Sequence, residues 1–202
     1  IEQWYSRMLG YFVEDRTPLS AKYGWSKDAV PFVSRNKLKY KNIVKGKSWG
    51  KEWESAWFHL TGEVKKEWRG KKIIVDLDFS GEGLVHTPKG KEIQGITNAS
   101  IWDQNFARTR VLVPKSCIKN GKVELWVETA ANSLFGIFVD VDPDQDNPKR
   151  HGTFDAKVET IDIGIFREDI WHLHLDVRIL LGLVEKLEDN STQRLRIIRT
   201  LN

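Results

Sequence analysis

Two histidines and an aspartate stand at alternate positions near the C-terminal end of the sequence. In IWHLHLDVRIL, residues 170–180, His172, His174 and Asp176 alternate with aliphatic residues. Imidazole nitrogens and a carboxylate are ligands that zinc accepts, so this spacing raises the question of a metal site. The answer depends on the local structure, because the three side chains share one face of a strand but not of a helix.

The surrounding sequence favours a helix at this position. REDIWHLHLDVRILLGLVEKLED, residues 167–189, contains no proline, and its apolar residues recur at steps of three or four. On a helix His172 and Asp176 are neighbours, whereas His174 points almost to the opposite side. We therefore expect no metal site here, but a His172–Asp176 surface pair and a half-buried His174.

Two groups of carboxylates offer other chemistry. Residues 140–146 carry an aspartate at every second position, like the start of a calcium-binding EF-hand loop. Asn147 and Thr153 then stand where the loop needs glycine and glutamate, so we expect a solvated acidic loop. Asp76 and Asp78 share one face of an expected strand, an arrangement that would suit paired glycosidase carboxylates; we interpret them as its solvent-facing side. No catalytic residue is predicted.

Composition limits the class of protein. The chain has 202 residues, a net charge of +4 and 40% hydrophobic residues, which is typical of a globular protein with one sizeable core. It contains no apolar run of about 18 residues, so we expect no membrane partner. The single cysteine, Cys117, excludes an internal disulfide and fits a reducing, cytoplasmic location. The lysines of residues 37–51 are expected to be a solvated surface, without a nucleic-acid partner.

The hydrophobic pattern divides the chain into three parts. Residues 1–55 are expected to form an N-terminal helix, over 1–12, and a loop-rich lead-in with a short strand near 37–44. Residues 56–166 alternate apolar and polar side chains between turn signals, which predicts an antiparallel β-sandwich of the galactose-binding-domain or jelly-roll type. Residues 167–202 are expected to form a helical connector of two helices, with Ser191 capping the second. The fold class is mainly β.

Several short blocks, taken in order, resemble a known family. They are Trp57-Phe58, Trp68-Arg69-Gly70, Gly81-Glu82-Gly83-Leu84, Gly95-Ile96-Thr97 and ETAANSLFG at 128–136. Their order and spacing are similar to the N-terminal region of the zinc-dependent retaining alpha-mannosidases, glycoside hydrolase family 38. The resemblance implies a non-catalytic N-terminal piece of an enzyme that hydrolyses terminal alpha-mannosides. It also implies that zinc and the catalytic residues belong to a catalytic domain absent from this chain.

A few residues and partners have expected roles of their own. Asn132, Phe135 and Gly136 are expected to organise a strand exit rather than to contact sugar. The partner is the catalytic domain of the same polypeptide, and a homo-oligomer of the full enzyme remains open. A free-standing carbohydrate-binding module is the alternative, and Trp102, in the polar stretch NASIWDQNF, is then the candidate sugar contact. The chain starts at Ile1 and its second helix lacks a stop signal, so we expect it to belong to a longer protein.

Overall fold

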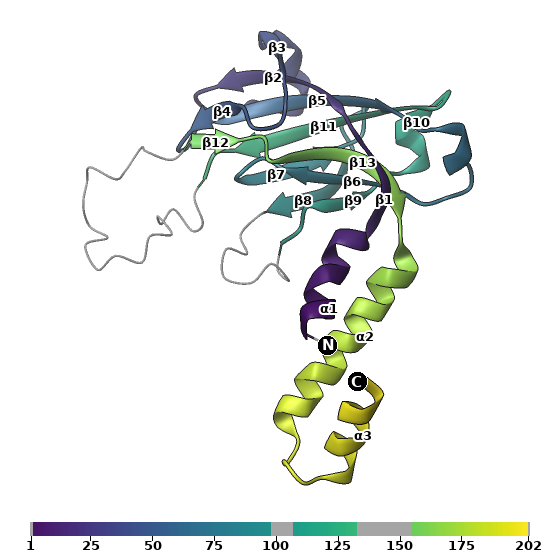
Figure 1. The fold of residues 1–202 in the computed structure, drawn as a ribbon. Helices are drawn as coiled ribbons and strands as arrows, with labels where there is room; N and C mark the ends of the chain where they lie inside the picture. The colour runs from purple at the N-terminus through teal and green to yellow at the C-terminus, as the bar shows by residue number, and fades with distance from the viewer. Residues whose placement is uncertain (1, 98–106, 133–154, 202) are drawn as a thin grey trace, which may run out of the picture. The chain divides into compact units, whose positions relative to one another are not determined.

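The computed structural model describes residues 2–97, 107–132 and 155–201 (Figure 1). The chain forms two compact units, Arg16–Gly164 and a helical unit of Ile1–Asp15 with Ile165–Asn202. The larger unit is built from antiparallel strands, and the HLHLD motif lies in the helical unit.

The largest sheet has the strand order β3-β2-β5-β11-β7-β8, and β10 pairs with β11 outside this path. Strand β11 lies centrally, since it pairs with β5 over its full length and with β7 over its last five residues. The strands of this sheet are β2 (Ser20–Ser26), β3 (Tyr40–Ile43), β5 (Ser55–Glu63), β7 (Glu82–His86), β8 (Glu92–Thr97), β10 (Ile118–Lys119) and β11 (Lys122–Ala130).

A second sheet has the order β1-β13-β6-β9, and β4 pairs with β12 in a separate ribbon. These strands are β1 (Val13–Pro18), β6 (Ile73–Asp78), β9 (Arg110–Leu112), β13 (Thr160–Phe166), β4 (Ser48–Lys51) and β12 (Asp155–Lys157). Short 3-10 turns also occur: η1 (Leu9–Tyr11) precedes β1, whereas η2 (Phe32–Lys37), η3 (Lys66–Trp68) and η5 (Lys115–Cys117) lie between strands.

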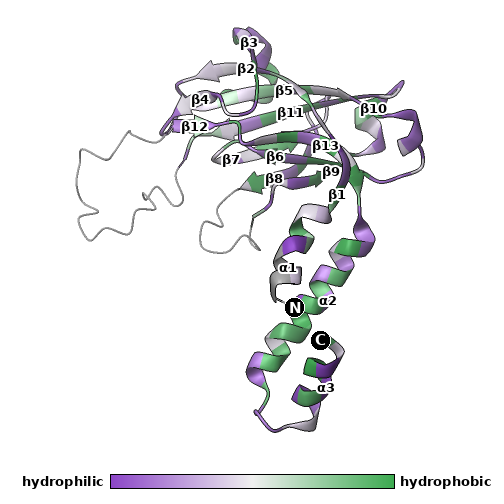
Figure 2. Ribbon diagram, viewed as in Figure 1, coloured by the Kyte–Doolittle hydropathy of each residue, from purple (hydrophilic) through white to green (hydrophobic). Residues whose placement is uncertain are grey.

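Aromatic side chains fill the space between the two sheets. The Phe58 ring of β5 lies 4.3 Å from the Phe79 ring, which follows β6, and Trp49 meets Phe58 edge-on. The Trp49 indole N–H donates to the Phe79 carbonyl at 2.8 Å, so this buried tryptophan satisfies its one polar atom. Apolar residues alternate with polar ones along the strands, as the colouring of Figure 2 shows. The predicted β-sandwich is confirmed.

The interpretation of residues 13–55 as mostly loop was wrong. Strands β1, β2 and β4 lie in this segment, and only the short strand expected near 37–44 was anticipated, as β3. The reason is the size of the side chains: in β2 the buried positions include Ala21 and Gly24, which give little hydrophobic contrast. The register between β2 and β5 places Ala21 opposite Leu60 and Tyr23 opposite Phe58, so β2 extends the core.

Three helices form the helical unit. They are α1 (Glu2–Met8), α2 (Glu168–Lys186) and α3 (Thr192–Leu201). The predicted N-cap is confirmed, because the Ser191 hydroxyl accepts a hydrogen bond from the Arg194 N–H at 3.3 Å. Within the described ranges, no helix combines the length and apolar character that a membrane crossing requires.

Asp76 was wrongly interpreted as solvent-facing. Its side chain is buried in β6, where Arg16 lies 2.9 Å away and the Thr109 hydroxyl donates to it at 2.6 Å. Arg110 approaches to 4.0 Å, and burial lowers the pKa of its guanidinium while Asp76 raises it. A neighbouring residue, Asp78, accepts the Ser80 backbone N–H in a local turn. The two carboxylates therefore serve the fold of β6.

Replacing Asp76 with alanine tests this network. Removing the Asp76 carboxylate leaves the Thr109 hydroxyl without this acceptor and leaves Arg16 with Asp162 at 3.6 Å, so we expect Asp76→Ala to lower the free energy of unfolding by about 2 kcal/mol. Urea unfolding measures the change. Asp28→Ala, at an exposed position, is the control and should stay within about 0.5 kcal/mol. Equal, small effects of the two changes would contradict the assigned role of Asp76.

Candidate functional site

Two of the sequence blocks that carry the family resemblance lie side by side. Strand β7 pairs with the end of β11, so that Glu82 faces Ala130 and Leu84 faces Glu128. The Glu82 backbone N–H donates to the side-chain oxygen of Asn132 at 3.0 Å. We call residues 81–84 and 128–132 the motif junction. Asn132 ties the exit of β11 to the start of β7, as a strand-ending amide can.

Glycine is required on the β7 side of the motif junction. A Cβ atom on Gly81 would lie 2.2 Å from the Ala130 carbonyl oxygen, and one on Gly83 would lie 2.9 Å from the Glu128 carbonyl oxygen. Both distances are too short for a carbon–oxygen contact, and both oxygens belong to the backbone. The Gly-Glu-Gly sequence therefore allows β7 to approach β11 closely.

A hollow of about 200 Å³ lies against the motif junction. Its polar lining residues are Glu82, Glu128, Ser55 and Thr129, and the Thr129 hydroxyl donates to the Ala56 carbonyl at 3.0 Å. Burial raises the pKa of the Glu128 carboxyl above its ordinary value of 4.5, and His86 acts in the opposite direction. Carboxylates and a hydroxyl in one hollow are suited to accept hydrogen bonds from a polyol or another donor-rich surface.

Exposed tryptophans lie next to the same strand ends. Trp25 and Trp53 keep 46% and 65% of their surface exposed. The Trp25 indole N–H donates to the Glu54 carboxylate at 2.8 Å, and the backbone of Glu54 accepts the Ala131 N–H at 2.8 Å. Trp53 has a positive φ of 67° and donates its N–H to the Ala131 carbonyl at 2.7 Å. We call Trp25, Trp53 and Glu54 the tryptophan ledge.

Sequence reasoning missed the tryptophan ledge. It lies in the segment interpreted as loop, and no spacing rule distinguishes an exposed tryptophan from a buried one. The WGKEWE sequence at 49–54 places two tryptophans on either side of a short polar segment. Trp49 enters the core, whereas Trp53 remains at the surface.

A second aromatic layer covers the outer face of the large sheet. The Phe32 ring of η2 packs edge-on against Trp57, whose indole N–H donates to the Val30 carbonyl at 2.6 Å. The Arg35 guanidinium lies 4.4 Å from the Trp126 ring, and burial lowers its pKa. Tyr40 also meets Trp126 edge-on, and burial raises the pKa of Tyr40 to about 12. This layer holds residues 30–40 on the sheet.

The HLHLD motif lies in the helical unit. The helical prediction is confirmed, since α2 spans it, but His174 is buried rather than half-buried. Its ring stacks on Tyr5 with centroids 4.3 Å apart and meets Phe12 edge-on at 5.1 Å. His172 instead contacts Trp171. Aromatic packing between α1 and α2 accounts for His174.

The other predicted site residues divide into described and undescribed ones. Asn132 is in the motif junction, whereas Trp102, Phe135 and Gly136 lie outside the described residues, as does the acidic stretch at 140–146. Cys117 is a free, buried thiol, and burial raises its pKa, which disfavours the reactive thiolate.

A comparison against protein families agrees with the fold. The family model described as "Alpha-mannosidase, jelly roll domain" matches residues 17–157, which is more than half of the chain. The chain therefore belongs to this family of alpha-mannosidase jelly-roll domains. The match begins in β1 and ends in β12, so it covers the strands that form the motif junction and the tryptophan ledge.

Individual proteins also match parts of the chain. Alpha-mannosidase G of Dictyostelium discoideum is 30% identical over 124 residues, which are 58% of this chain and 11% of the relative. The chain thus spans about a tenth of that curated relative. Among solved structures, beta-glucuronidase 2 of Bacteroides uniformis is 12% identical, with a TM-score of 0.48 over 74% of this chain and 17% of that one. A putative beta-galactosidase of Bacteroides fragilis is 11% identical, with a TM-score of 0.48 over 75% and 23%.

The burial of Glu128 predicts a pH-dependent stability. Because its pKa is raised on folding, the folded state binds this proton more tightly, and stability falls as the pH rises above 4.5. Glutamine carries no charge, so Glu128→Gln should melt higher than the wild type at neutral pH and equally at a pH below the ordinary carboxyl pKa. Thermal melts across this range measure the difference.

The control for this pH series is Glu92→Gln, which changes an exposed carboxylate of β8. It should shift the midpoint little at either pH. A Glu128→Gln variant that melts lower than the wild type at neutral pH would show that the ionised carboxylate stabilises the fold, against the assigned cause of its pKa shift.

Proposed function

We propose that this chain is a non-catalytic N-terminal domain of a zinc-dependent retaining alpha-mannosidase of glycoside hydrolase family 38. The observation that carries the proposal is the family match over residues 17–157. The complete protein hydrolyses terminal alpha-mannosides in glycan catabolism. The sandwich described above supports and positions the domain that performs this chemistry.

The carboxylates of this chain support a structural assignment. Asp76 is held by Arg16 and Thr109, and its oxygens are engaged in the fold. Among the described residues, no group of three or more His, Cys, Asp or Glu side chains could share a metal ion. These residues do not fit the zinc that the family resemblance implies, so we assign zinc to the catalytic domain of the same polypeptide and derive no step through it here.

The helical unit supplies a surface for that domain. Its helices expose large apolar side chains, which cost free energy in water and favour burial against a partner. These residues are Trp171, Leu173, Ile179, Leu183 and Leu195. We propose that the catalytic domain, or a second copy in a homo-oligomer of the full enzyme, covers them. The buried free thiol of Cys117 fits a cytoplasmic location.

Hydrolysis of an aryl alpha-mannoside tests the proposal. The purified 202-residue chain should release no product above a mock preparation, with or without added zinc or cobalt. The complete polypeptide should release product, and a chelator should abolish this activity. Zinc-dependent turnover by the 202-residue chain would place the active site here. A complete polypeptide without mannosidase activity would contradict the family function.

A second candidate function is carbohydrate binding by the sandwich itself. The tryptophan ledge favours it, because exposed indoles stack on sugar rings and a carboxylate next to them accepts hydroxyl hydrogen bonds. Glu54 is already engaged by Trp25, which orients both groups. Affinity electrophoresis in a mannan gel separates the candidates: retardation that is lost in Trp53→Ala supports binding, and unretarded wild-type chain excludes it.

A further inference from the structure

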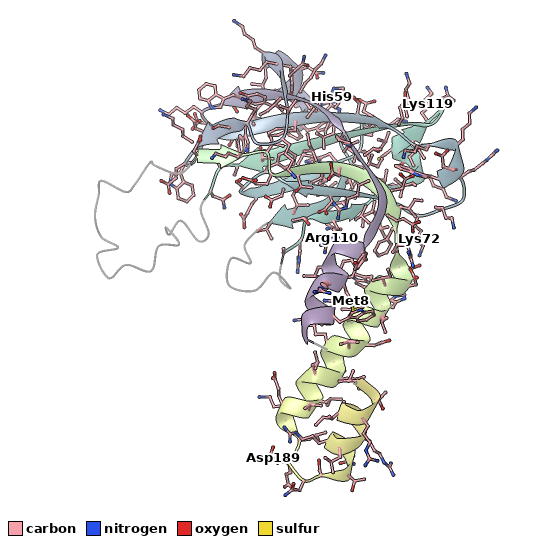
Figure 3. All side chains as sticks on the ribbon, viewed as in Figure 1. Met8, His59, Lys72, Arg110, Lys119 and Asp189 are labelled. Atoms are coloured by element: carbon pink, nitrogen blue, oxygen red, sulfur yellow. The ribbon has the colours of Figure 1, made fainter. Side chains whose placement is uncertain are left out.

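A lysine-rimmed pocket lies at the end of the sandwich that carries the β10–β11 turn. Its volume is about 740 Å³, which is within the range of small-molecule sites. Four lysines line it: Lys89, Lys91, Lys119 and Lys122. We call it the lysine pocket. Figure 3 labels Lys119, the last residue of β10.

Two tight turns hold these lysines in place. In the turn between β7 and β8, the Thr87 N–H donates to the Lys91 carbonyl, and the Lys91 N–H donates to the Thr87 hydroxyl at 3.0 Å. Gly90 has a φ of +87° and closes this turn. Between β10 and β11, Asn120 and Gly121 have positive φ values of 51° and 72°, as in a two-residue hairpin turn.

The hairpin turn places two positive charges directly opposite each other. Lys119 and Lys122 form a cross-strand pair, and like charges at such a pair destabilise a sheet. Lys122 faces Glu63 on its other side, in β5, but no carboxylate lies within ion-pair distance of either lysine among the described residues. A like-charge pair that destabilises the sheet is expected where its two charges bind a ligand.

The remaining lining determines the class of ligand. The buried lining residues of the pocket are Thr87 and Cys117, and Pro88 and Ser116 line it nearer the surface. The one acidic lining residue, Glu124, is engaged by His59 at 3.0 Å. The pocket therefore offers several ammonium groups for a compact anion and an apolar wall for an organic body. A phosphate group has a charge of about −2 and three acceptor oxygens.

We propose that the lysine pocket binds a sugar phosphate, with the phosphate between the two lysine-bearing turns. The negative charge of the ligand is inferred from the four lysines of the lining and does not depend on the proposed function. The choice of a hexose as its body rests on the proposed mannosidase function, because hydrolysis of an alpha-mannoside releases a hexose. The lysine pocket lies at the opposite end of β11 from the motif junction.

Mannose 6-phosphate is the probe for the test. The 202-residue chain is titrated and followed by its amide NMR signals, with inorganic phosphate and mannose as matched ligands. We expect saturable shifts at residues 87–91 and 116–122, a dissociation constant at least tenfold lower for the sugar phosphate than for phosphate, and no binding of mannose. Affinity should fall as salt is added.

The variant Lys119→Glu separates binding from folding. It replaces the like-charge pair by an opposite-charge pair, so its melting midpoint should equal or exceed that of the wild type. Its affinity for mannose 6-phosphate should fall at least tenfold. Lys27→Glu makes the same charge change on an exposed lysine outside the pocket and should bind as the wild type does.

Several results would overturn the proposal. One is the absence of saturable shifts with mannose 6-phosphate. Others are equal affinities for sugar phosphate and inorganic phosphate, or unchanged binding in Lys119→Glu. Binding of a polyglutamate peptide in place of the sugar phosphate would assign the pocket to an acidic protein segment instead. Mannosidase activity of the complete polypeptide is measured separately, so its failure and the failure of this binding remain distinguishable.

Discussion

The pairing of β11 with β5 on one side and β7 on the other is the constraint on which the sandwich depends. The register sends Val123, Leu125 and Val127 into the core, and a slip by one residue would bring Glu124 and Glu128 inward instead. On the β7 side the close approach is possible only because Gly81 and Gly83 lack side chains. Asn132 then closes the strand exit by accepting the Glu82 N–H. The sequence blocks at 81–84 and 128–132 thus contain the residues that pair β11 with β7 and close its exit.

The same strand separates two chemically different ends of the sandwich. Its nine residues span about 26 Å at a rise of about 3.3 Å per residue. At the Ala130 end lie the motif junction with Glu82 and Glu128, and the tryptophan ledge with Trp25 and Trp53. At the Lys122 end lies the lysine pocket. The carboxylates of the first end suit a neutral ligand that donates hydrogen bonds, whereas the lysines of the second end suit an anion. Because the two surfaces lie at opposite ends of β11, a ligand at one does not block the other.

Sequence patterns predicted those parts of the fold that have strong hydrophobic contrast. The alternation in β5 and β11 and the helical spacing around His174 were sufficient to predict sandwich strands and α2. Strand β2 was missed because Ala21 and Gly24 provide little contrast, and Asp76 was misplaced because its burial depends on Arg16, which is 60 residues away. The tryptophan ledge escaped prediction for a related reason. Whether Trp53 is exposed depends on its hydrogen bond to Ala131, a contact between distant segments.

The role of Asn132 in the complete polypeptide tests the central claim, that the motif junction is a scaffold and not part of the active site. The measurement is the melting midpoint and the turnover number of Asn132→Ala beside those of the wild type, on an aryl alpha-mannoside. Loss of the amide leaves the Glu82 N–H without its side-chain acceptor, so we predict a destabilisation of about 1 kcal/mol, seen as a lower midpoint, with an unchanged turnover number. A large fall in turnover with an unchanged midpoint would contradict the account and place Asn132 next to the reacting sugar.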